Sequence, residues 1–204
     1  MSIKKRRFIL GEVLMNIIKY TEEVLNGEKV YLMPRPTEKH QYYLGRLHNY
    51  LGRLHISMSN FFEDHRCHVY IEIDVHLTDE DWVVPDLCVI CDRTKFEHGA
   101  YKGIPELMVE ILSPSTRIRD LGYKKDLYAR VGVKEYWIVD GQNKSIDKYE
   151  LKGNVYILTQ SAIYVECYDV LTKEEQAQYT KHITSTIFPK LEIDVLKVFK
   201  QIRQ

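Results

Sequence analysis

The 204-residue sequence predicts an α/β fold in which a central mixed β-sheet is flanked by helices. A long segment after Thr37 repeats its apolar residues at helical spacing. Apolar runs over 82–91 and 107–112 have the length and composition of buried strands. A helical segment over 121–131 follows the second run and leads back to further strand-like residues, which is the element order of a sheet covered by helices.

The composition indicates one soluble domain over residues 1–204. Hydrophobic residues make up 45% and charged residues 28% of the chain, which are ordinary values for a globular protein. Lys+Arg and Asp+Glu both number 29, so the whole-molecule positive field of many nucleic-acid-binding proteins is missing. No apolar run approaches the length of a membrane span and no signal-peptide pattern opens the chain, so we expect a cytoplasmic protein with no membrane partner.

Two helices separated by a strand are predicted for the N-terminal part. Gly11–Leu25 has a helical pattern, Asn26-Gly27 is a turn, and Lys29–Met33 has strand composition. Thr37 would cap the next helix, whose apolar stripe consists of Leu44, Leu47, Leu51, Leu54, Met58 and Phe61 or Phe62. His40 lies on this stripe, and we interpret it as a core or capping residue rather than a catalytic one.

Strands dominate the middle of the chain. His68–Leu77 alternates strictly between apolar and polar side chains, which is typical of a strand with one exposed face. After a turn at 79–81, Trp82–Cys91 is predicted as a strand that carries Asp86. The run Leu107–Leu112 is short and apolar, so we expect it in the centre of the sheet.

A helix is expected over Leu121–Val131, with Asp120 as its N-cap and Gly132 at its end. The strands expected after it are 135–140, 145–151, 155–158 and 163–167. Beyond a Phe-Pro break, the C-terminal segment carries an apolar tail that we expect to dock on the core, formed by Leu191, Ile193, Val195, Leu196 and Phe199.

The four cysteines do not form a recognisable metal or redox motif. Cys88 and Cys91 lie in an expected strand, so their thiols point to opposite faces. Zinc would need a second ligand pair at matching spacing, and a redox pair would sit at the start of a helix. We therefore expect structural or incidental thiols, including Cys67 and Cys167.

Two acids in apolar surroundings carry the functional signal. Asp86 follows Pro85 in a strand, and Glu110 lies inside the apolar run 107–112. Burying an unpaired carboxylate costs several kcal/mol or raises its pKa, so acids are seldom placed there without a role. Mg²⁺ or Mn²⁺ prefers oxygen ligands and keeps several waters, so Asp86, Glu110 and the carbonyl of Ile111 would suffice as ligands.

A lysine would complete this site for phosphodiester hydrolysis. The chemistry requires an activated water and positive charge near the phosphoryl oxygens. Lys124 is our candidate, because it lies one helical turn from both Asp120 and Tyr128 and shares their face. Lys125 would point about 100° away on an ideal helix. Acids dominate between residues 72 and 97 and bases between 117 and 134, which fits a metal site beside a phosphate track, although two solvated faces would give the same pattern.

The chain closely resembles a known bacterial family over about residues 20–200. The likeness is specific in Pro85-Asp86, in the run from Pro105 through Glu110 to Ser115, in Arg119-Asp120 with Lys124 and Tyr128, and in Gly132 to Asp140. Glu23, Gly27, Pro36 and His40 match its N-terminal pattern, and Ile187-Phe188-Pro189 with Leu191 matches its C-terminal one. The family comprises proposed restriction endonucleases, was long filed as domain of unknown function 820, and belongs to the PD-(D/E)XK nuclease superfamily.

The resemblance implies a restriction-endonuclease-like core and a metal-dependent DNA endonuclease. By position, Asp86 and Glu110 match the metal-binding acids of the superfamily, and Glu23 is a possible additional acid. The superfamily's usual lysine stands two residues after the second acid, where this chain has Leu112. The family is similar in often lacking that lysine, and Lys124 resembles a migrated substitute. DNA is the implied substrate, and a homodimer is a candidate assembly because cutting both strands commonly takes two active sites.

Other interpretations of the same residues stay open at this point. Asp86 could cap a turn, and Glu110 could form a buried ion pair with Arg117 or Lys124. A catalytically inactive protein of nuclease fold that binds nucleic acid or protein would keep the sheet without the turnover. A metal hydrolase acting on small nucleotides is a third option, which a neutral net charge allows.

Overall fold

The computed structural model describes residues 22–31, 38–63 and 66–200. Its main sheet has six strands in the order β12-β11-β10-β9-β6-β3. Only β9 and β10 run parallel in it, and the other neighbours are antiparallel, so the sheet is mixed. In chain order its strands are β3 (His68–Ile71), β6 (Leu87–Ile90), β9 (Leu107–Ile111), β10 (Glu135–Asp140), β11 (Ser145–Lys152) and β12 (Val155–Ile163).

A second sheet of short strands lies beside the main one, in the order β2-β1-β5-β4-β8-β7. Its strands are β1 (Glu22–Leu25), β2 (Glu28–Tyr31), β4 (Val75–His76), β5 (Trp82–Val83), β7 (Phe96–Glu97) and β8 (Ala100–Lys102). A two-stranded sheet near the C-terminus pairs β13 (His182–Thr184) with β14 (Glu192–Asp194). The predicted α/β architecture is confirmed.

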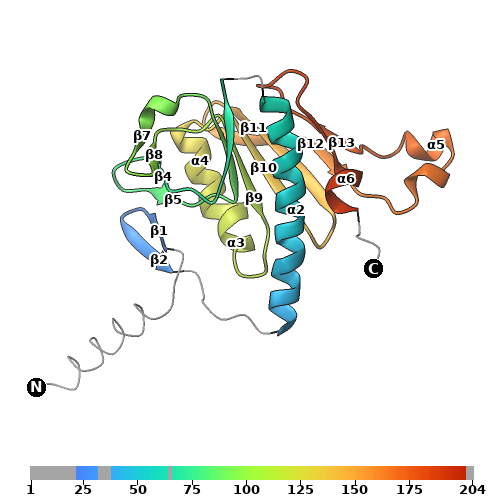
Figure 1. Cartoon of the computed structure of the whole chain (residues 1–204), viewed down its shortest axis with the longest axis horizontal. Coiled ribbons are helices and arrows are strands. Elements are labelled where there is room, and N and C mark those ends of the chain that lie inside the picture. The colour runs from blue at the N-terminus through green and yellow to red at the C-terminus, as the bar shows by residue number, and fades with distance from the viewer. Residues whose placement is uncertain (1–21, 32–37, 64–65, 201–204) are drawn as a thin grey trace, which may run out of the picture.

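Helices cover both faces of the main sheet (Figure 1). On one face lie the long helix α2 (Glu38–Phe62) and the short C-terminal helix α6 (Val195–Phe199). On the other face a continuous helical segment consists of α3 (Arg117–Arg119), the π-helical turn η2 (Asp120–Lys124) and α4 (Lys125–Val131). The remaining short helices are η1 (Arg93–Lys95), η3 (Tyr168–Val170) and α5 (Lys173–Gln176).

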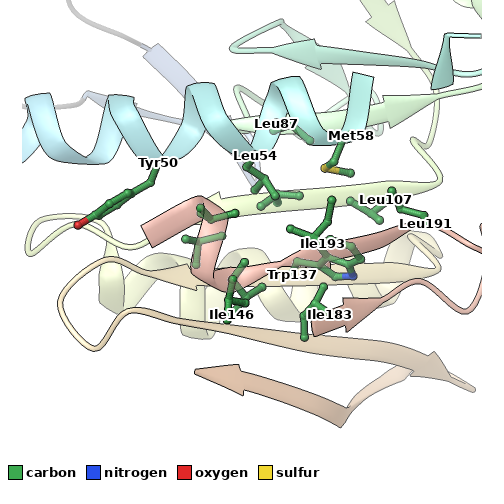
Figure 2. Close-up of a cluster of buried hydrophobic side chains, with 14 of the residues drawn as sticks. Tyr50, Leu54, Met58, Leu87, Leu107, Trp137, Ile146, Ile183, Leu191 and Ile193 are labelled. Atoms are coloured by element: carbon green, nitrogen blue, oxygen red, sulfur yellow. The ribbon is translucent and has the colours of Figure 1, made fainter. Parts of the chain in front are cut away.

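Helix α2 anchors the larger apolar core. Leu54 and Met58 point from the helix onto the strands, where they meet residues such as Trp137 (Figure 2). The C-terminal segment adds Leu191 and Ile193 to the same core, where they lie between α2 and Trp137 (Figure 2). The helix predicted after Thr37 and the docking of the apolar tail are therefore confirmed.

The smaller core lies on the opposite face of the sheet, beneath α4. Leu127 and Tyr128 of the helix pack against strand residues that include Met108 and Tyr136. Because strand side chains alternate between faces, Val109 joins the larger core whereas Glu110 points to the α4 side. Leu112 also belongs to the smaller core, which agrees with the expectation that it shares a side with Glu110.

The N-terminal prediction of a helix over Gly11–Leu25 is wrong for its described part. Glu22–Leu25 is strand β1, which forms a hairpin with β2. The turn is Asn26-Gly27, and both residues have positive φ, at 53° and 74°. This turn geometry fits the twist of a two-residue hairpin and therefore favours strands on either side. Residues up to 21 and the side chain of His40 lie outside the described part of the chain.

Three other predicted elements need correction. The alternating run 68–77 is broken at Glu72, where φ is +47°, and its halves join different sheets as β3 and β4. The predicted strand 82–91 is likewise divided around Pro85-Asp86 into β5 and β6. The two small strands expected over 155–167 are one strand, β12, with a register shift opposite Lys148/Tyr149.

Asp120 is not an N-cap, because the helical segment begins earlier. Its N–H donates to the carbonyl of Thr116 at 2.9 Å, so Asp120 is already inside the helix. Gly132 ends the helix as predicted, in a left-handed conformation with φ 94°. Of the thiols, Cys67 and Cys91 form a disulfide, and Cys88 is buried on the other face of the sheet, as expected from its spacing. Within the described residues, no helix has both the length and the hydropathy to cross a bilayer.

The left-handed end of α4 predicts opposite effects for two glycine substitutions. Gly132→Ala should lower the free energy of unfolding by about 1 kcal/mol, because an L-residue is strained at positive φ. Gly52→Ala, inside α2 with open space at the Cβ position, should raise it by about 1 kcal/mol through helix propensity. Urea denaturation of both variants measures the two changes, and equal signs would contradict the assignment of Gly132 as the helix end.

Candidate active site between β6, β9 and the facing helix

Asp86 and Glu110 come together through the pairing of β6 with β9. Leu87 lies opposite Val109 in this antiparallel ladder, so the residues just beyond them, Asp86 and Glu110, are also neighbours. Oδ2 of Asp86 accepts a hydrogen bond from the N–H of Ile111 at 2.5 Å. The structure thus fixes the Asp86 carboxylate against the strand that carries Glu110, although the two acids are far apart in the sequence.

Lys124 reaches these two acids from the helical segment that covers the α4 face of the sheet. Its Nζ lies 2.9 Å from Oε1 of Glu110 and 2.7 Å from Oε1 of Glu23, and its side chain is almost fully buried. Oδ1 of Asp120 is 3.9 Å away. The η2 turn that contains Asp120 and Lys124 is π-helical, a local widening that is frequent at functional sites.

Tyr128 lies on the same face of the helical segment as Lys124. Its hydroxyl donates to Oε1 of Glu110 at 2.8 Å, so this oxygen receives both the ammonium and the phenol. The expected common face of Asp120, Lys124 and Tyr128 is therefore present. Both hydrogen bonds go to Oε1, which leaves Oε2 of Glu110 as the oxygen for a further ligand.

Glu23 enters from strand β1 and completes the cluster. Its Oε1 accepts the N–H of Val84 at 3.2 Å, and its Oε2 lies 3.2 Å from Nη1 of Arg119. Arg119 also approaches Oδ1 of Asp120 at 3.9 Å. The correction of residues 22–25 from helix to strand matters here, because only the hairpin brings Glu23 onto the site.

The cluster contains more negative than positive charge. Four acids, Glu23, Asp86, Glu110 and Asp120, surround two bases, Lys124 and Arg119. Oε2 of Glu23 and Oδ1 of Asp120 are buried without a hydrogen-bond partner. Two negative charges in excess of the bases, together with carboxylate oxygens that lack a hydrogen bond in a buried place, favour a divalent cation or bound protons.

The pKa values reflect this excess of acid. Burial raises the pKa of Asp86 from 3.8 to about 6, against the opposing effect of the Ile111 N–H. Burial, together with the neighbouring acids Asp120, Asp86 and Glu23, raises the pKa of Glu110 to about 8. Burial alone would lower the pKa of Lys124, but Glu110, Glu23 and Asp120 more than offset it, so its pKa is raised and the amine is charged.

The donor set fits a hard divalent cation that keeps several waters. No three histidine, cysteine or acidic side chains within the described residues converge as a preformed metal cage. Mg²⁺ does not need one, since one or two carboxylates with water commonly hold it. Asp86 and Glu110 supply two carboxylates in a pocket of excess negative charge. For Ile111 the structure shows the N–H engaged with Asp86, and a ligand role for its carbonyl stays a prediction.

Sequence reasoning found some of these residues and missed others. Asp86, Glu110 and Lys124 were named from their apolar strands and helical spacing, and Glu23 from its likeness to a family pattern. Arg119 was missed as a partner of Glu23, since only the tertiary structure joins residues 96 positions apart in the chain. The possible Glu110–Lys124 pair is present, whereas Arg117 pairs with Asp140 at 2.8 Å.

Comparisons with known proteins show the family and the fold of the chain. The sequence profile of a family named Uma2, described as "Putative restriction endonuclease", matches residues 19–179. An uncharacterized protein from Synechocystis sp. is 30% identical over 142 residues, which is 63% of this chain and 72% of that protein. A crystal structure from Anabaena variabilis, titled as a putative nuclease belonging to DUF820, superposes with a TM-score of 0.57 over 93% of this chain and 96% of the other, at 16% identity. At that identity the likeness shows the fold.

Removal of the Lys124 ammonium should destabilise the protein strongly. Lys124→Met leaves the buried Glu110 and Glu23 without their cation, at a cost of about 3–5 kcal/mol in the free energy of unfolding. Adding Glu110→Gln to the same chain should recover part of this loss, because one orphaned charge disappears. Lys148→Met is the matched control: Glu150 keeps Lys152 and partial contact with solvent, so about 1 kcal/mol or less is expected. Urea denaturation measures all three, and similar losses for both lysines would contradict the cluster's importance.

The raised pKa values predict how stability depends on pH in the absence of metal. Between about pH 4 and pH 8 the folded protein binds more protons at Asp86 and Glu110 than the unfolded chain does. This contribution to stability is complete at low pH and is lost as the pH rises through the folded-state pKa values. The melting temperature in EDTA should therefore fall less steeply from pH 5 to pH 8 in Glu110→Gln than in the wild type. Identical slopes in differential scanning calorimetry would refute the shift assigned to Glu110.

Proposed function

Because the chain belongs to the Uma2 family of putative restriction endonucleases, we propose that it is a Mg²⁺- or Mn²⁺-dependent DNA endonuclease that hydrolyses phosphodiester bonds. One observation carries the proposal: the buried Lys124 ammonium lies 2.9 Å from Glu110, beside Asp86. This arrangement supports the proposal because two carboxylates that could bind a metal and one ammonium that could bind a phosphate lie at one point of the sheet.

Each residue of the cluster has a role in this proposal. Asp86 and Glu110 hold the cation, which when bound supplies an activated water and neutralises charge on the phosphate. The N–H of Ile111 orients Asp86, and the hydroxyl of Tyr128 orients Glu110. The Lys124 ammonium donates a hydrogen bond to a phosphoryl oxygen. It acts as a point charge that is already desolvated and positioned.

Glu23, Asp120 and Arg119 keep the ammonium in place. Lys124 is held between Glu23 and Glu110, so it stays charged when Glu110 turns an oxygen toward the cation. Arg119 in turn balances Glu23. The same positive charge that offsets the acids in the free protein is therefore available to the substrate phosphate.

A second candidate function is a catalytically inactive binding module of the same fold. The observation that favours it is that Lys124 already has two carboxylate partners at hydrogen-bonding distance. In such a protein the ion-pair cluster would stabilise the fold and would not exchange for a metal and a phosphate. A measurement of metal binding distinguishes the endonuclease from the inactive binding module, since the module needs no cation.

Three substitutions test the proposed endonuclease. Asp86→Asn, Glu110→Gln and Lys124→Ala should each reduce metal-dependent nicking of supercoiled plasmid DNA by about 100-fold or more, since each removes a metal-binding or charge-stabilising group. Glu192→Gln is the matched control, because Glu192 is an exposed acid on β14, whose neighbouring Ile193 packs in the larger core on the α2 face. Full activity in all three variants would remove these residues from the site.

Calorimetric titration with Mn²⁺ at pH 8 provides the complementary measurement. The wild type and Glu192→Gln should bind the cation, and Asp86→Asn should bind it at least about tenfold more weakly because it loses one carboxylate ligand. Absence of binding by the folded wild type at millimolar Mn²⁺ would favour the inactive binding module. Activity on nucleotide monomers and none on plasmid would instead indicate a hydrolase of small nucleotides.

A further inference from the structure

Strand β12 forms one edge of the main sheet, and its composition is unusual for an edge. The nine residues Val155–Ile163 include no charged side chain and no proline, in a chain of which 28% is charged. Val155, Ile157, Leu158 and Ile163 are all exposed. Natural edge strands are usually protected by charges, prolines or a covering segment, because their unpaired peptide groups accept another strand.

Only part of this edge is covered by the chain itself. The N–H of Ile163 donates to the carbonyl of Thr180, and the side chain of Gln160 bridges to His182 and Thr184. Within the described part of the chain, the outer edge of residues 155–158 makes no such hydrogen bond to another segment. An additional strand therefore has room to pair at the beginning of β12.

The hydrogen bonds of β11 show which peptide groups of β12 point outward. Leu151 donates its N–H inward to the carbonyl of Lys134, and Leu151 lies opposite Tyr156 in the ladder. Leu151 and Tyr156 are therefore a non-hydrogen-bonded pair of this antiparallel ladder, in which the N–H and C=O of each residue point away from the other strand. The N–H and C=O of Tyr156 therefore point to the open edge, as do those of Leu158 two residues further on.

We propose that a second copy of this chain pairs antiparallel with β12, about a two-fold axis at Ile157. This register places Tyr156 opposite Leu158 of the other copy, so that the outward peptide groups of both residues bond across the interface. Ile157 then faces Ile157 of the other copy in a non-hydrogen-bonded pair, where side chains are closest. In this register only Ile157 meets its own copy, and a strand without charged side chains pairs with a second copy without charge repulsion.

The pairing has a consequence that rests on the proposed function. A two-fold axis perpendicular to the sheet keeps the α4 side of both copies on one side of a continuous sheet. Seven inter-strand steps of about 4.8 Å separate the two β9 strands by roughly 34 Å, which is close to one turn of B-DNA. Two copies would thus present two catalytic clusters to the same face of one duplex.

A charge placed on the two-fold axis tests the interface. Ile157→Lys sets two ammonium groups opposite each other and should raise the dissociation constant of the dimer at least about tenfold. Ile56→Lys on α2 is the matched control, since Ile56 is 60% exposed and Ile157 48% exposed. Sedimentation velocity without DNA or metal should show a dimer for the wild type and the control. A wild-type monomer at high micromolar concentration, or a dimer unaffected by Ile157→Lys, would overturn the proposal.

Crosslinking tests the same register without a destabilising charge. Ile157→Cys in a Cys167→Ser background should form a disulfide-linked dimer under mild oxidation, because a non-hydrogen-bonded pair has Cα atoms about 4.5 Å apart, within disulfide range. Ile56→Cys in that background should stay monomeric on a denaturing gel. Equal crosslinking of both variants would contradict the pairing at Ile157. These readouts involve no cleavage, so an inactive enzyme would leave them valid, and a monomeric enzyme could still nick DNA.

Discussion

The ion pair between Lys124 and Glu110 is the contact on which the arrangement of the buried cluster depends. It joins the central strand β9 to the helix that covers it, in a place where neither partner reaches water. A charge buried there is tolerated only with a partner, so the strand, the helix and the β1 hairpin must be positioned together. The same contact explains why an acid can occupy the middle of an apolar strand.

The two faces of the main sheet differ in character: one is an apolar core, and the other carries the charged cluster. The α2 face is an apolar core that includes Leu54, Met58 and Trp137, and it supplies the burial that keeps the sheet rigid. The α4 face combines a smaller core with the charged cluster, so its polar groups are held by well-packed neighbours such as Tyr136. Catalytic groups on strands and helices of a rigid scaffold keep their geometry better than groups on loops.

The excess of acids over bases distinguishes this cluster from a balanced ion-pair network. A balanced network would leave every carboxylate near its ordinary pKa or below it. Here burial and mutual repulsion raise the pKa of Asp86 and of Glu110 instead. The raised pKa values favour bound protons at these carboxyl groups in the free protein, whereas the raised pKa of Lys124 keeps its amine charged.

The sequence by itself determined the α/β class, the long helix after Thr37, the end of a helix at Gly132 and the strands over 107–112 and 135–151, because periodicity and turn residues act locally. It also named Asp86, Glu110 and Lys124, since acids in apolar strands and a lysine at helical spacing are visible in one dimension. Only the tertiary structure decided that Glu22–Leu25 is a strand and that Arg119 contacts Glu23. The Asn26-Gly27 turn is a local hairpin signal, but the pairing of β1 with β5 and the ion pair between Glu23 and Arg119 join distant segments, and no local pattern encodes those contacts.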